Sequence, residues 1–521
     1  MLRLKPASLD WALAHVNRFD DTTMLPLPFE YSAIEHNWSD IRSYLSGQDL
    51  LNWKVRAHRT LLAPKSRYAF RIITQLDPLD FLVFGALIRE IARDIEAIRV
   101  PVQRNIVFSY RISPRKDGQL FDPSIGYDQF LSQSRELLKD KTISHVALAD
   151  IADFYPRIYH HRLQNALSNA TSQSQHVLAI MRLLSGWNGT ETFGIPVGNA
   201  PSRLLAEATI ADVDDALLAS GMNFVRFNDD YRIFTKSHAE AYRALAFLAE
   251  VLYRNHGLTL QPQKTHVLRV KTFRERHLLS PEEKEIDSLY KKFQELIDEI
   301  GLSSSYEEIE YSDLNEDQQE LIDSMNLSGL FQEEIAKPET DFGIVKFVLR
   351  RMGQLGDASL VDTVFENIDI LYPAFPDIVQ YLGNLRGLRT AQYHEIGARV
   401  LDLLESSLVS ELEYHRIWAL DLFTHTRQWD NEDRFFAMLS TAHDDFCRRK
   451  LILAMGRAHQ RHWFQSQWRN LMNQSPWPRR ALLSGASCMA PDARKHWYKS
   501  VLPQLDELEK AVVKWATANP F

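Results

Sequence analysis

Two adjacent carboxylates, Asp229 and Asp230, stand between two short apolar and aromatic runs. The flanking stretches "FVRF" (224–227) and "YRIF" (231–234) have the composition of β-strands. A hairpin with an Asn-Asp turn explains this pattern, because Asn and Asp are ordinary turn residues. A metal site explains it as well, because a divalent cation neutralises two like charges that lie side by side. The metal site differs in requiring a third carboxylate from another part of the chain.

A candidate for that carboxylate is Asp150, which stands 79 residues before Asp229. It lies at the end of a β-run from Val146 to Ile151, and Pro156 then permits entry into a helical pattern. A strand that ends in Asp and turns into a helix places the carboxylate at the edge of a sheet, where a ligand can reach it. Anionic oxygens from two chain segments can hold a pair of divalent cations about 3.5–4 Å apart. The sequence therefore predicts one metal site formed by Asp150 and the Asp-Asp hairpin.

Further segments lie in order around the hairpin. The stretch "FGIPVGNAPSR" (193–203) is rich in Gly and Pro, which predicts a stiff loop whose backbone can approach a ligand closely. The stretch "HGLTLQPQKTHVL" (256–268) predicts a loop and a strand, with the lone Lys264 between them. A rival acidic cluster at 212–215 lies in an apolar pattern of helical spacing, so we expect it to be a solvated helix face. The stretch 104–112, "RNIVFSYRI", is predicted to be a strand.

In this order the segments resemble the palm of reverse transcriptases. The stretches that carry the resemblance are "ADIADFYPRIYHHRL" (149–163), "GIPVGNAPSRLLAE" (194–207), "FNDD" (227–230) and "GLTLQPQKT" (257–265), with a fingers-like segment at 63–87. The best subgroup match is the bacterial abortive-infection and defence-associated reverse transcriptases, the AbiK-like group. This resemblance implies an α/β (α+β) fold of fingers and palm, followed by an all-α domain of HEAT-like helical repeats.

The resemblance also implies a function. We expect a DNA polymerase that acts in phage defence, is protein-primed, uses dNTPs without a template, makes single-stranded DNA and assembles as a homo-oligomer. An RNA-templated enzyme that uses a bound non-coding RNA is the alternative, and a non-catalytic scaffold that binds nucleic acid or a partner is an alternative of another class. Two departures from the family pattern are Phe227-Asn228 before the two Asp residues and Val197 where many retroviral-type enzymes have Gln. The second departure puts ordinary template-guided selection in doubt.

Individual roles follow from the same resemblance. Asp150, Asp229 and Asp230 would hold two Mg²⁺, for which Mn²⁺ is a substitute, together with the Ile151 carbonyl. The remaining expected roles are nucleotide sugar selection by Tyr155, triphosphate binding by Lys65 and Arg71, backbone approach to the substrate at Pro196 and Gly198, and protonation or neutralisation of the leaving pyrophosphate by Lys264. Tyr31 and Tyr44 are the priming candidates.

The pattern of helices and strands predicts three parts: a fingers and palm domain at 1–270, an acidic helical linker or lid at 271–340, and a helical domain at 341–521. Residues 281–340 hold 18 Asp and Glu against 4 Lys and Arg, so the net charge of −8 hides a weakly basic remainder. In the last part, Arg416, Arg448 and Arg479 recur at spacings of 32 and 31, each two residues after an aromatic. This faint period suggests stacked helix pairs, and an irregular helical domain is the alternative.

Composition sets further expectations. The two cysteines allow no disulfide framework, and no run approaches the length of a membrane span, so we expect a cytoplasmic protein without membrane contact. The helical half is rich in Trp and Arg, which could stack and clamp single-stranded DNA but are more often core at helical spacing. The residues concerned are Trp418, Trp429, Trp463, Trp468, Trp477 and Trp497, with Arg448, Arg449, Arg479 and Arg480.

Overall fold

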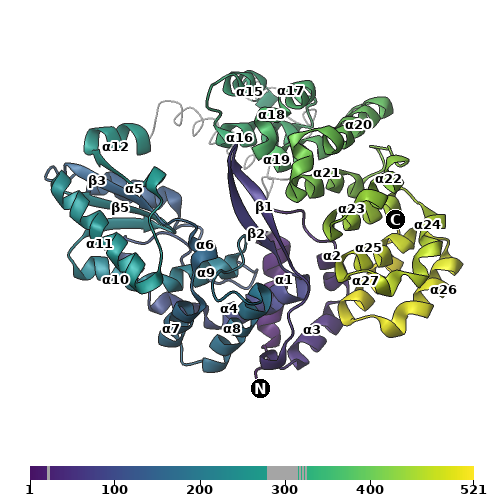
Figure 1. Cartoon of the computed structure of the whole chain (residues 1–521), viewed down its shortest axis with the longest axis horizontal. Coiled ribbons are helices and arrows are strands. Elements are labelled where there is room, and N and C mark those ends of the chain that lie inside the picture. The colour runs from purple at the N-terminus through teal and green to yellow at the C-terminus, as the bar shows by residue number, and fades with distance from the viewer. Residues whose placement is uncertain (20–23, 279–314, 316–317, 320–321, 323–324) are drawn as a thin grey trace. The chain divides into compact units, whose positions relative to one another are not determined.

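A computed structural model describes residues 1–521 except 20–23, 279–314, 316–317, 320–321 and 323–324 (Figure 1). The described chain divides into two compact units. Unit 1 comprises residues 1–23, 27–60 and 73–280, and unit 2 comprises residues 24–26, 61–72 and 281–521. Most of the acidic segment predicted at 271–340 falls outside the described residues.

Unit 1 contains a four-stranded sheet in the order β4-β5-β3-β6. Its strands are β3 (His145–Asp150), β4 (Asn223–Phe227), β5 (Asp230–Thr235) and β6 (His266–Arg269), and neighbouring strands run antiparallel. The strands expected on both sides of the Asn-Asp turn and before Asp150 are therefore confirmed. Every residue of β3 and β5 after the first is buried, which reflects a sheet that is covered on both faces.

Helices cover the sheet and complete unit 1 (Figure 1). One face carries an apolar cluster that includes Phe130, Phe234 and Phe273. Phe130 comes from α5 (Tyr127–Leu137) and Phe273 from α12 (Val270–His277). The other helices of unit 1 are α1 (Pro6–Phe19), α2 (Glu30–His36), α3 (Trp38–Gly47), α4 (Pro78–Ala97), α6 (Phe154–Arg157), α7 (His160–Ala170), α8 (Ser174–Asn188), α9 (Ala200–Thr209), α10 (Ala211–Ala219) and α11 (His238–His256).

The helix α11 ends as its sequence predicts. Gly257 follows its last residue with φ of 66°, and the Gly257 N–H donates to the Tyr253 carbonyl. Glycine adopts this left-handed conformation without the steric clash that a Cβ would cause.

The strand predicted at 104–112 is wrong. Only an isolated parallel bridge joins Val107 to Arg226, and a second isolated bridge joins Ile112 to Phe121. Asn105 and Tyr110 both adopt positive φ, 52° and 49°, so the backbone turns away from an extended conformation on both sides of Val107. The segment therefore borders the sheet without adding a strand to it.

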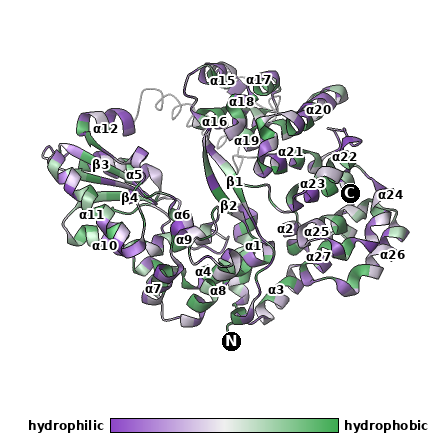
Figure 2. Cartoon of the chain, in the orientation of Figure 1, coloured by the Kyte–Doolittle hydropathy of each residue, from purple (hydrophilic) through white to green (hydrophobic). Residues whose placement is uncertain are grey.

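Unit 2 is helical except for residues 61–72. These residues form most of a hairpin of two strands, β1 (Arg59–Ser66) and β2 (Ala69–Gln75). Hydrophobic and hydrophilic residues share each of its helices, as amphipathic packing requires (Figure 2). Its described helices are α15 (Leu327–Ile335), α16 (Phe342–Leu355), α17 (Val361–Glu366), α18 (Ile368–Leu371), α19 (Phe375–Gly383), α20 (Thr390–Ser406), α21 (Glu413–His425), α22 (Arg434–Thr441), α23 (Asp445–Arg457), α24 (Arg461–Ser466), α25 (Pro476–Gly485), α26 (Pro491–Val501) and α27 (Glu507–Ala518).

Alternate helices of unit 2 pack in succession. Helix α19 packs on α21, α21 on α23, α23 on α25, and α25 on α27. The aromatics of the faint sequence period, Tyr414, Phe446 and Trp477, occupy the second position of α21, α23 and α25 and are all buried. The period thus marks equivalent positions on three successive helices, while a HEAT-like classification stays a prediction.

Candidate active site

Asp150 and Asp230 face each other across two strands of the sheet. Asp150 is the last residue of β3, Asp230 is the first of β5, and the two are direct partners in the antiparallel register. Directly opposed residues in such a pair project on the same face of the sheet. Two carboxylates from distant segments therefore meet at one end of the sheet, as the sequence predicts.

The turn between β4 and β5 consists of Asn228 and Asp229. Asn228 has φ of 55°, a left-handed conformation that Asn tolerates better than most residues. Its side-chain amide donates to Asp229 Oδ1 at 2.9 Å, and the Ile151 N–H donates to the Asp229 carbonyl at 3.2 Å. These bonds place Asp229 beside the end of β3.

Lys264 contacts the same cluster from a third segment. It ends the short 3-10 helix Pro262–Lys264 just before β6, and its ammonium donates to Asp150 Oδ2. Burial opposes the charge on Lys264, but the bond to Asp150 and the nearby Asp230 and Asp229 outweigh it and raise the pKa of this ammonium. Lys264 is therefore a charged partner of the carboxylates, whereas its role toward the pyrophosphate stays a prediction.

The three carboxylates crowd one another. Burial, followed by the negative charges of Asp229 and Asp150, raises the pKa of Asp230 to about 7. Like charges that share a partly buried site disfavour ionisation unless a cation compensates them. The site therefore has the character of a cation site, with oxygen ligands of the kind that Mg²⁺ and Mn²⁺ accept.

The oxygen donors of this site suit a divalent cation, although they are not yet arranged around one. No group of three or more His, Cys, Asp and Glu side chains within the described ranges is already arranged as a ligand set. The Lys264 ammonium occupies one oxygen of Asp150. The carboxylates of Asp150, Asp229 and Asp230 would hold a divalent cation once Lys264 turns aside, and this assignment stays a prediction.

Tyr155 borders the turn. Its hydroxyl donates to Asn228 Oδ1 at 3.3 Å, and its carbonyl accepts from the Ile195 N–H at 3.2 Å. The second bond joins Tyr155 to the Gly/Pro loop that contains Pro196 and Gly198. The structure thus brings Tyr155 close to the carboxylates, whereas its contact with a sugar stays a prediction.

The Gly/Pro loop uses its glycines as expected. Gly194 and Gly198 have φ of 91° and 107°, values that side chains with a Cβ rarely adopt. A Cβ on Gly194 would also lie 3.3 Å from the Pro156 carbonyl. Asn199 then caps α9 by accepting from the Ser202 N–H at 2.9 Å, so the loop leads rigidly into the helix.

A comparison with protein families matches this region. Residues 89–307, less than half of the chain, match the family described as "Reverse transcriptase (RNA-dependent DNA polymerase)". This part of the chain is a reverse transcriptase domain. The match includes Asp150, the Gly/Pro loop, the Asp229-Asp230 turn and Lys264, and it indicates a polymerase of the reverse transcriptase type.

Other comparisons add little. No curated protein matches the chain. Among solved structures, telomerase from Candida albicans in complex with a TWJ fragment of telomeric RNA is similar at 13% identity over 72% of this chain and 69% of that chain, with a TM-score of 0.32. Apo telomerase from Candida tropicalis is similar at 10% identity over 94% of this chain and 73% of that chain, with a TM-score of 0.33. TM-scores this low do not establish a common fold, so the domain assignment rests on the family match.

The interpretation of the acidic cluster at 212–215 is wrong for Asp214. Its side chain is buried and pairs with Arg226 of β4 at 2.6 Å, where a solvated face was expected. Burial raises the pKa of Asp214, although Arg226 opposes this shift. Asp212 also has a partner, the His256 imidazole at 2.8 Å. An Arg at a strand position between buried neighbours, as in "FVRF", is the signal that could have announced a buried acid.

Four predicted residues fall outside the geometry of the reverse transcriptase domain described above. Lys65 and Arg71 are exposed on the β1–β2 hairpin, in the part that belongs to unit 2, so their phosphate role stays a prediction. Tyr31 is buried, with its ring edge-on to Phe81, and lacks the exposure that a priming hydroxyl needs. Tyr44 is half-buried, and its priming role stays a prediction.

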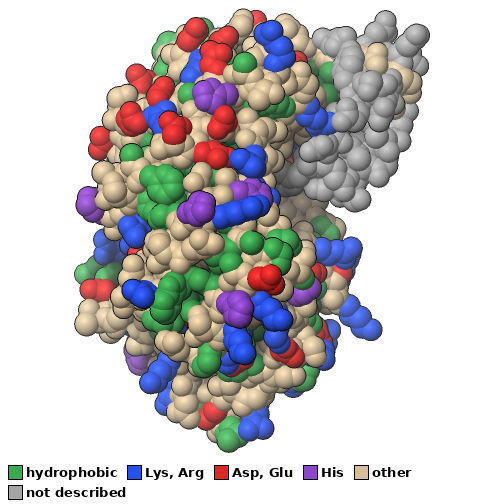
Figure 3. Space-filling model, turned by 90° about the vertical axis from the view of Figure 1, so that its right-hand side faces the viewer, with side chains coloured by type: hydrophobic (Ala, Val, Ile, Leu, Met, Phe, Trp, Pro, Cys, Tyr) green, Lys and Arg blue, Asp and Glu red, His purple; other side chains and the backbone are tan. Residues whose placement is uncertain are grey.

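The aromatic and Arg residues of unit 2 are mostly core. Trp477 is buried, and the buried Arg449 and Arg480 lie over its ring at 5.2 and 4.4 Å. Trp418, Trp429 and Trp497 are buried as well, whereas Trp468 is 47% exposed. These buried rings cannot stack on DNA bases. In Figure 3, Lys and Arg are interspersed with acidic and hydrophobic side chains on the face shown.

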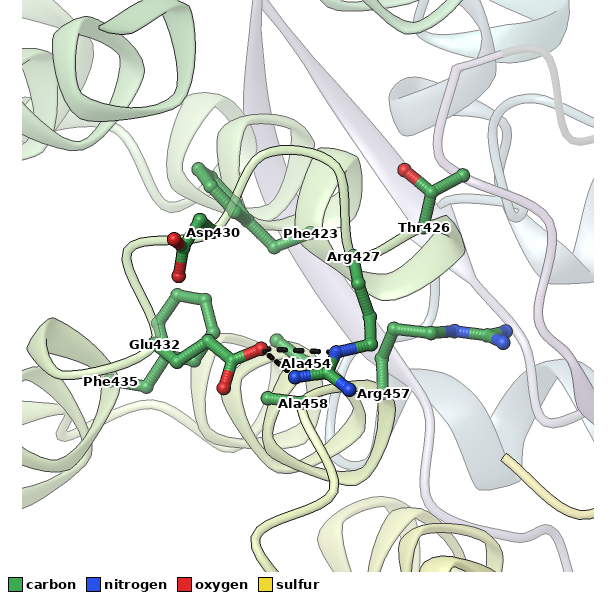
Figure 4. Close-up of a pocket in the computed structure, with 9 residues that line it drawn as sticks. All are labelled: Phe423, Thr426, Arg427, Asp430, Glu432, Phe435, Ala454, Arg457 and Ala458. Carbon is green, nitrogen blue, oxygen red and sulfur yellow. Dashed lines mark hydrogen bonds and ion pairs between the residues drawn. The ribbon is translucent and has the colours of Figure 1, made fainter. Parts of the chain in front are cut away.

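Unit 2 also has a small pocket, which is lined by none of the predicted catalytic residues. It lies where α21, α23 and the chain before α22 meet, and Arg427 reaches across it to Glu432 at 3.0 Å (Figure 4). Arg457 contributes to its wall and donates to the Thr424 carbonyl at 3.2 Å. Glu432 pairs with Arg427 inside the pocket, so the pocket gives no support to a product-binding role. Within the described ranges, no helix is both long and apolar enough to cross a bilayer.

Proposed function

We propose that this protein polymerises dNTPs by a two-metal mechanism at the end of β3. The observation that carries the proposal is the meeting of Asp150, Asp229 and Asp230 from two segments of a reverse transcriptase domain, with Lys264 beside them. Bound Mg²⁺ would supply Lewis-acid activation of the attacking hydroxyl and charge neutralisation at the triphosphate.

The chain's own residues would position the reactants. Asp150 and Asp230 present carboxylates from one face of the sheet, and the turn presents Asp229 from beside it. Phosphoryl transfer depends mostly on such positioning and on charge stabilisation. Lys264, kept charged by its acidic neighbours, would move from Asp150 to the leaving pyrophosphate and neutralise it there.

Tyr155 and the Gly/Pro loop would shape the nucleotide site. The Ile195 N–H fixes the Tyr155 carbonyl, and Asn228 holds the Tyr155 hydroxyl, so the ring is restrained at both ends. We propose that this ring lies against the sugar and disfavours a 2′-hydroxyl. Lys65 and Arg71 are the proposed triphosphate-binding residues.

We further propose protein-primed, untemplated synthesis in phage defence by a cytoplasmic homo-oligomer. The support is the sequence resemblance to the AbiK-like group and the presence of Val197 where Gln is usual. The Val197 carbonyl accepts from the Thr74 N–H at 3.2 Å, which ties the loop to β2. An apolar side chain at this position offers no hydrogen bond to a template base.

RNA-templated synthesis is the second candidate, because the matched family is described as RNA-dependent. It requires an RNA, either bound during purification or added, whose sequence the product copies. The alternative of another class, a non-catalytic scaffold, would keep the fold and incorporate no dNTP.

The test incubates purified protein with Mg²⁺ and one labelled dNTP at a time, without template or primer, and resolves the mixture on a denaturing gel. Nuclease-sensitive label that shifts the protein band supports self-primed, untemplated synthesis. Incorporation only after RNA and a primer are added favours the templated enzyme. No incorporation under either condition, with wild type indistinguishable from Asp229→Asn, would leave the scaffold.

A further inference from the structure

A network of buried charges lies behind the Asn228-Asp229 turn. Arg226 of β4 is fully buried, and so is Glu207 of α9, while Asp214 of α10 is 1% exposed. The network continues through Arg99, which donates to Glu207 Oε2 at 2.6 Å and to the Tyr110 carbonyl at 2.9 Å. Buried charges of this kind persist where partners and hydrogen bonds satisfy them.

Arg226 uses its whole guanidinium in this network. Nε and Nη2 donate to the two oxygens of Asp214 at 2.8 and 2.6 Å. Nη1 and Nη2 donate to the two oxygens of Glu207 at 3.1 and 2.9 Å. Nη1 donates in addition to the main-chain carbonyl of Asn228 at 2.8 Å. A planar fork held by two carboxylates has little freedom to move, so its bond to the carbonyl has a fixed direction.

That carbonyl belongs to the peptide that joins Asn228 to Asp229. The Ile151 N–H holds the carbonyl on the other side of Asp229, so both peptides that flank this residue are fixed. Asn228 also has a positive φ of 55°, a conformation that persists when its surroundings over-determine it. The backbone that carries the Asp229 side chain is therefore held on one side by the bond from Arg226.

We propose that Arg226 is a positioning residue for nucleotidyl transfer: held by Glu207 and Asp214, it fixes the turn so that the Asp229 carboxylate points toward the cation site with Asp150 and Asp230. The inference rests on the proposed function. A buried ion pair by itself is weak support for stability, since apolar replacements are often as stable. Orientation of the turn is a use that an apolar replacement cannot fulfil.

The experiment compares wild type with Arg226→Lys, Arg226→Met and Arg111→Met. Arg111 is the matched control, because it is 1% exposed and donates to Glu96 at 2.9 Å and to the Val100 carbonyl at 2.6 Å, with no bond to the turn. Lys keeps the charge of Arg226 but lacks the planar fork that bonds each carboxylate through two nitrogens and also reaches the carbonyl. For each variant we would measure the melting temperature, kcat and KM for dNTP, the Mg²⁺ concentration for half-maximal activity, and the rise in melting temperature on adding Mn²⁺.

We expect Arg226→Lys and Arg226→Met to lower kcat on the order of 10²-fold, since misplacing a reacting group by about 1 Å has this effect. KM should change by less than about threefold, the Mg²⁺ midpoint should rise, and the Mn²⁺-induced rise in melting temperature should shrink. Arg111→Met should lower the melting temperature while its Mg²⁺ midpoint and Mn²⁺ response stay as in wild type.

The proposal is overturned if Arg226→Lys keeps the wild-type kcat, Mg²⁺ midpoint and Mn²⁺ response and differs only in melting temperature. If Arg226→Met does not fold, the same measurements on Arg226→Lys and Asp214→Asn decide whether the proposal holds. A wild type that incorporates no dNTP but responds to Mn²⁺ contradicts the proposed function alone, and the Mn²⁺ response of the variants still tests the positioning. A wild type that neither incorporates dNTP nor responds to Mn²⁺ overturns both the proposed function and the positioning role of Arg226.

Discussion

The two faces of the four-stranded sheet in unit 1 hold two buried arginines in different ways. On one face Arg232 of β5 lies 4.1 Å from the centre of the Phe130 ring, within the apolar cluster, and bonds to the Ser134 hydroxyl at 3.1 Å. On the other face Arg226 of β4 meets two carboxylates and a turn carbonyl.

The comparison shows that one face mainly stabilises the sheet, whereas the other fixes the geometry of the turn. Apolar contacts are non-directional and tolerate small shifts, so the first face stabilises the sheet without fixing any one atom. Ionic hydrogen bonds are directional, so the second face fixes the turn that carries Asp229. The carboxylates Asp150 and Asp230 lie at the end of the sheet, on the face that carries Arg232.

The largest effect is expected from Asp150→Asn. Loss of one anionic ligand should lower Mg²⁺-dependent dNTP incorporation on the order of 10³-fold, comparable to the loss of a directly acting charge-stabilising group. The free energy of unfolding should change by less than about 1 kcal/mol, because the lost ion pair joins Asp150 to a Lys264 side chain that is 48% exposed. Incorporation assays and denaturant unfolding test both parts, and a variant with unchanged incorporation would remove Asp150 from the site.

Phe130→Ala should lower stability and leave the metal dependence of activity unchanged. Removing a fully buried ring from the apolar face should lower the free energy of unfolding of unit 1 by about 3–5 kcal/mol. At a temperature where the variant is folded, its Mg²⁺ midpoint should equal that of wild type. A shifted midpoint would mean that the apolar face also sets the geometry of the carboxylates.

Glu207→Gln tests the charged face through the pH dependence of stability. Burial opposes ionisation of Glu207, but Arg226 and Arg99 outweigh it and hold its pKa below the ordinary value of 4.5. A carboxyl with a lowered folded-state pKa contributes stability above its unfolded value and loses it as the pH falls through the folded pKa. The variant should therefore be less stable by about 3 kcal/mol between pH 5 and 8.

The difference between wild type and Glu207→Gln should shrink as the pH falls below 4.5. For Phe130→Ala the cost should be the same at every pH, because no ionisable group is removed. Denaturant unfolding at several pH values measures both, and a pH-independent cost of Glu207→Gln would show that the pKa of Glu207 is the same in the folded and unfolded protein.

Arg232→Met should have a smaller effect on stability. The Met side chain keeps the packing against Phe130 but loses the cation–π contact and the bond to Ser134, for a cost of about 1–2 kcal/mol. Thermal unfolding measures this change. A loss as large as that of Glu207→Gln would mean that the two faces depend equally on buried charge.

Local sequence patterns predicted much of the fold and part of the site. The strands around Asp150 and on both sides of the Asn-Asp turn, and the end of α11 at Gly257, follow from neighbouring residues. The strand expected at 104–112 did not form, because positive φ at Asn105 and Tyr110 interrupts it. Composition alone could not foresee those two backbone conformations.

The residues behind the turn were not predictable in the same way. Asp214 looked like part of a solvated helix face, since only the packing of α10 against the sheet buries it. The bond between Arg99 and Glu207 joins residues 108 apart, a separation at which the sequence shows no pairing. In unit 2 the Trp and Arg residues allowed a core or a groove, with a core favoured, and their burial shows that most of them form a core.

The sequence by itself determined the strands on both sides of the Asn-Asp turn and the position of the carboxylates at strand ends and in a turn. These depend on steric and hydrogen-bonding preferences between residues a few positions apart. The tertiary structure alone decided that Asp150 lies opposite Asp230, that Lys264 reaches Asp150, and that Arg226 holds the turn. Such contacts exist only when distant segments pack, because burial is what makes a charge require a partner.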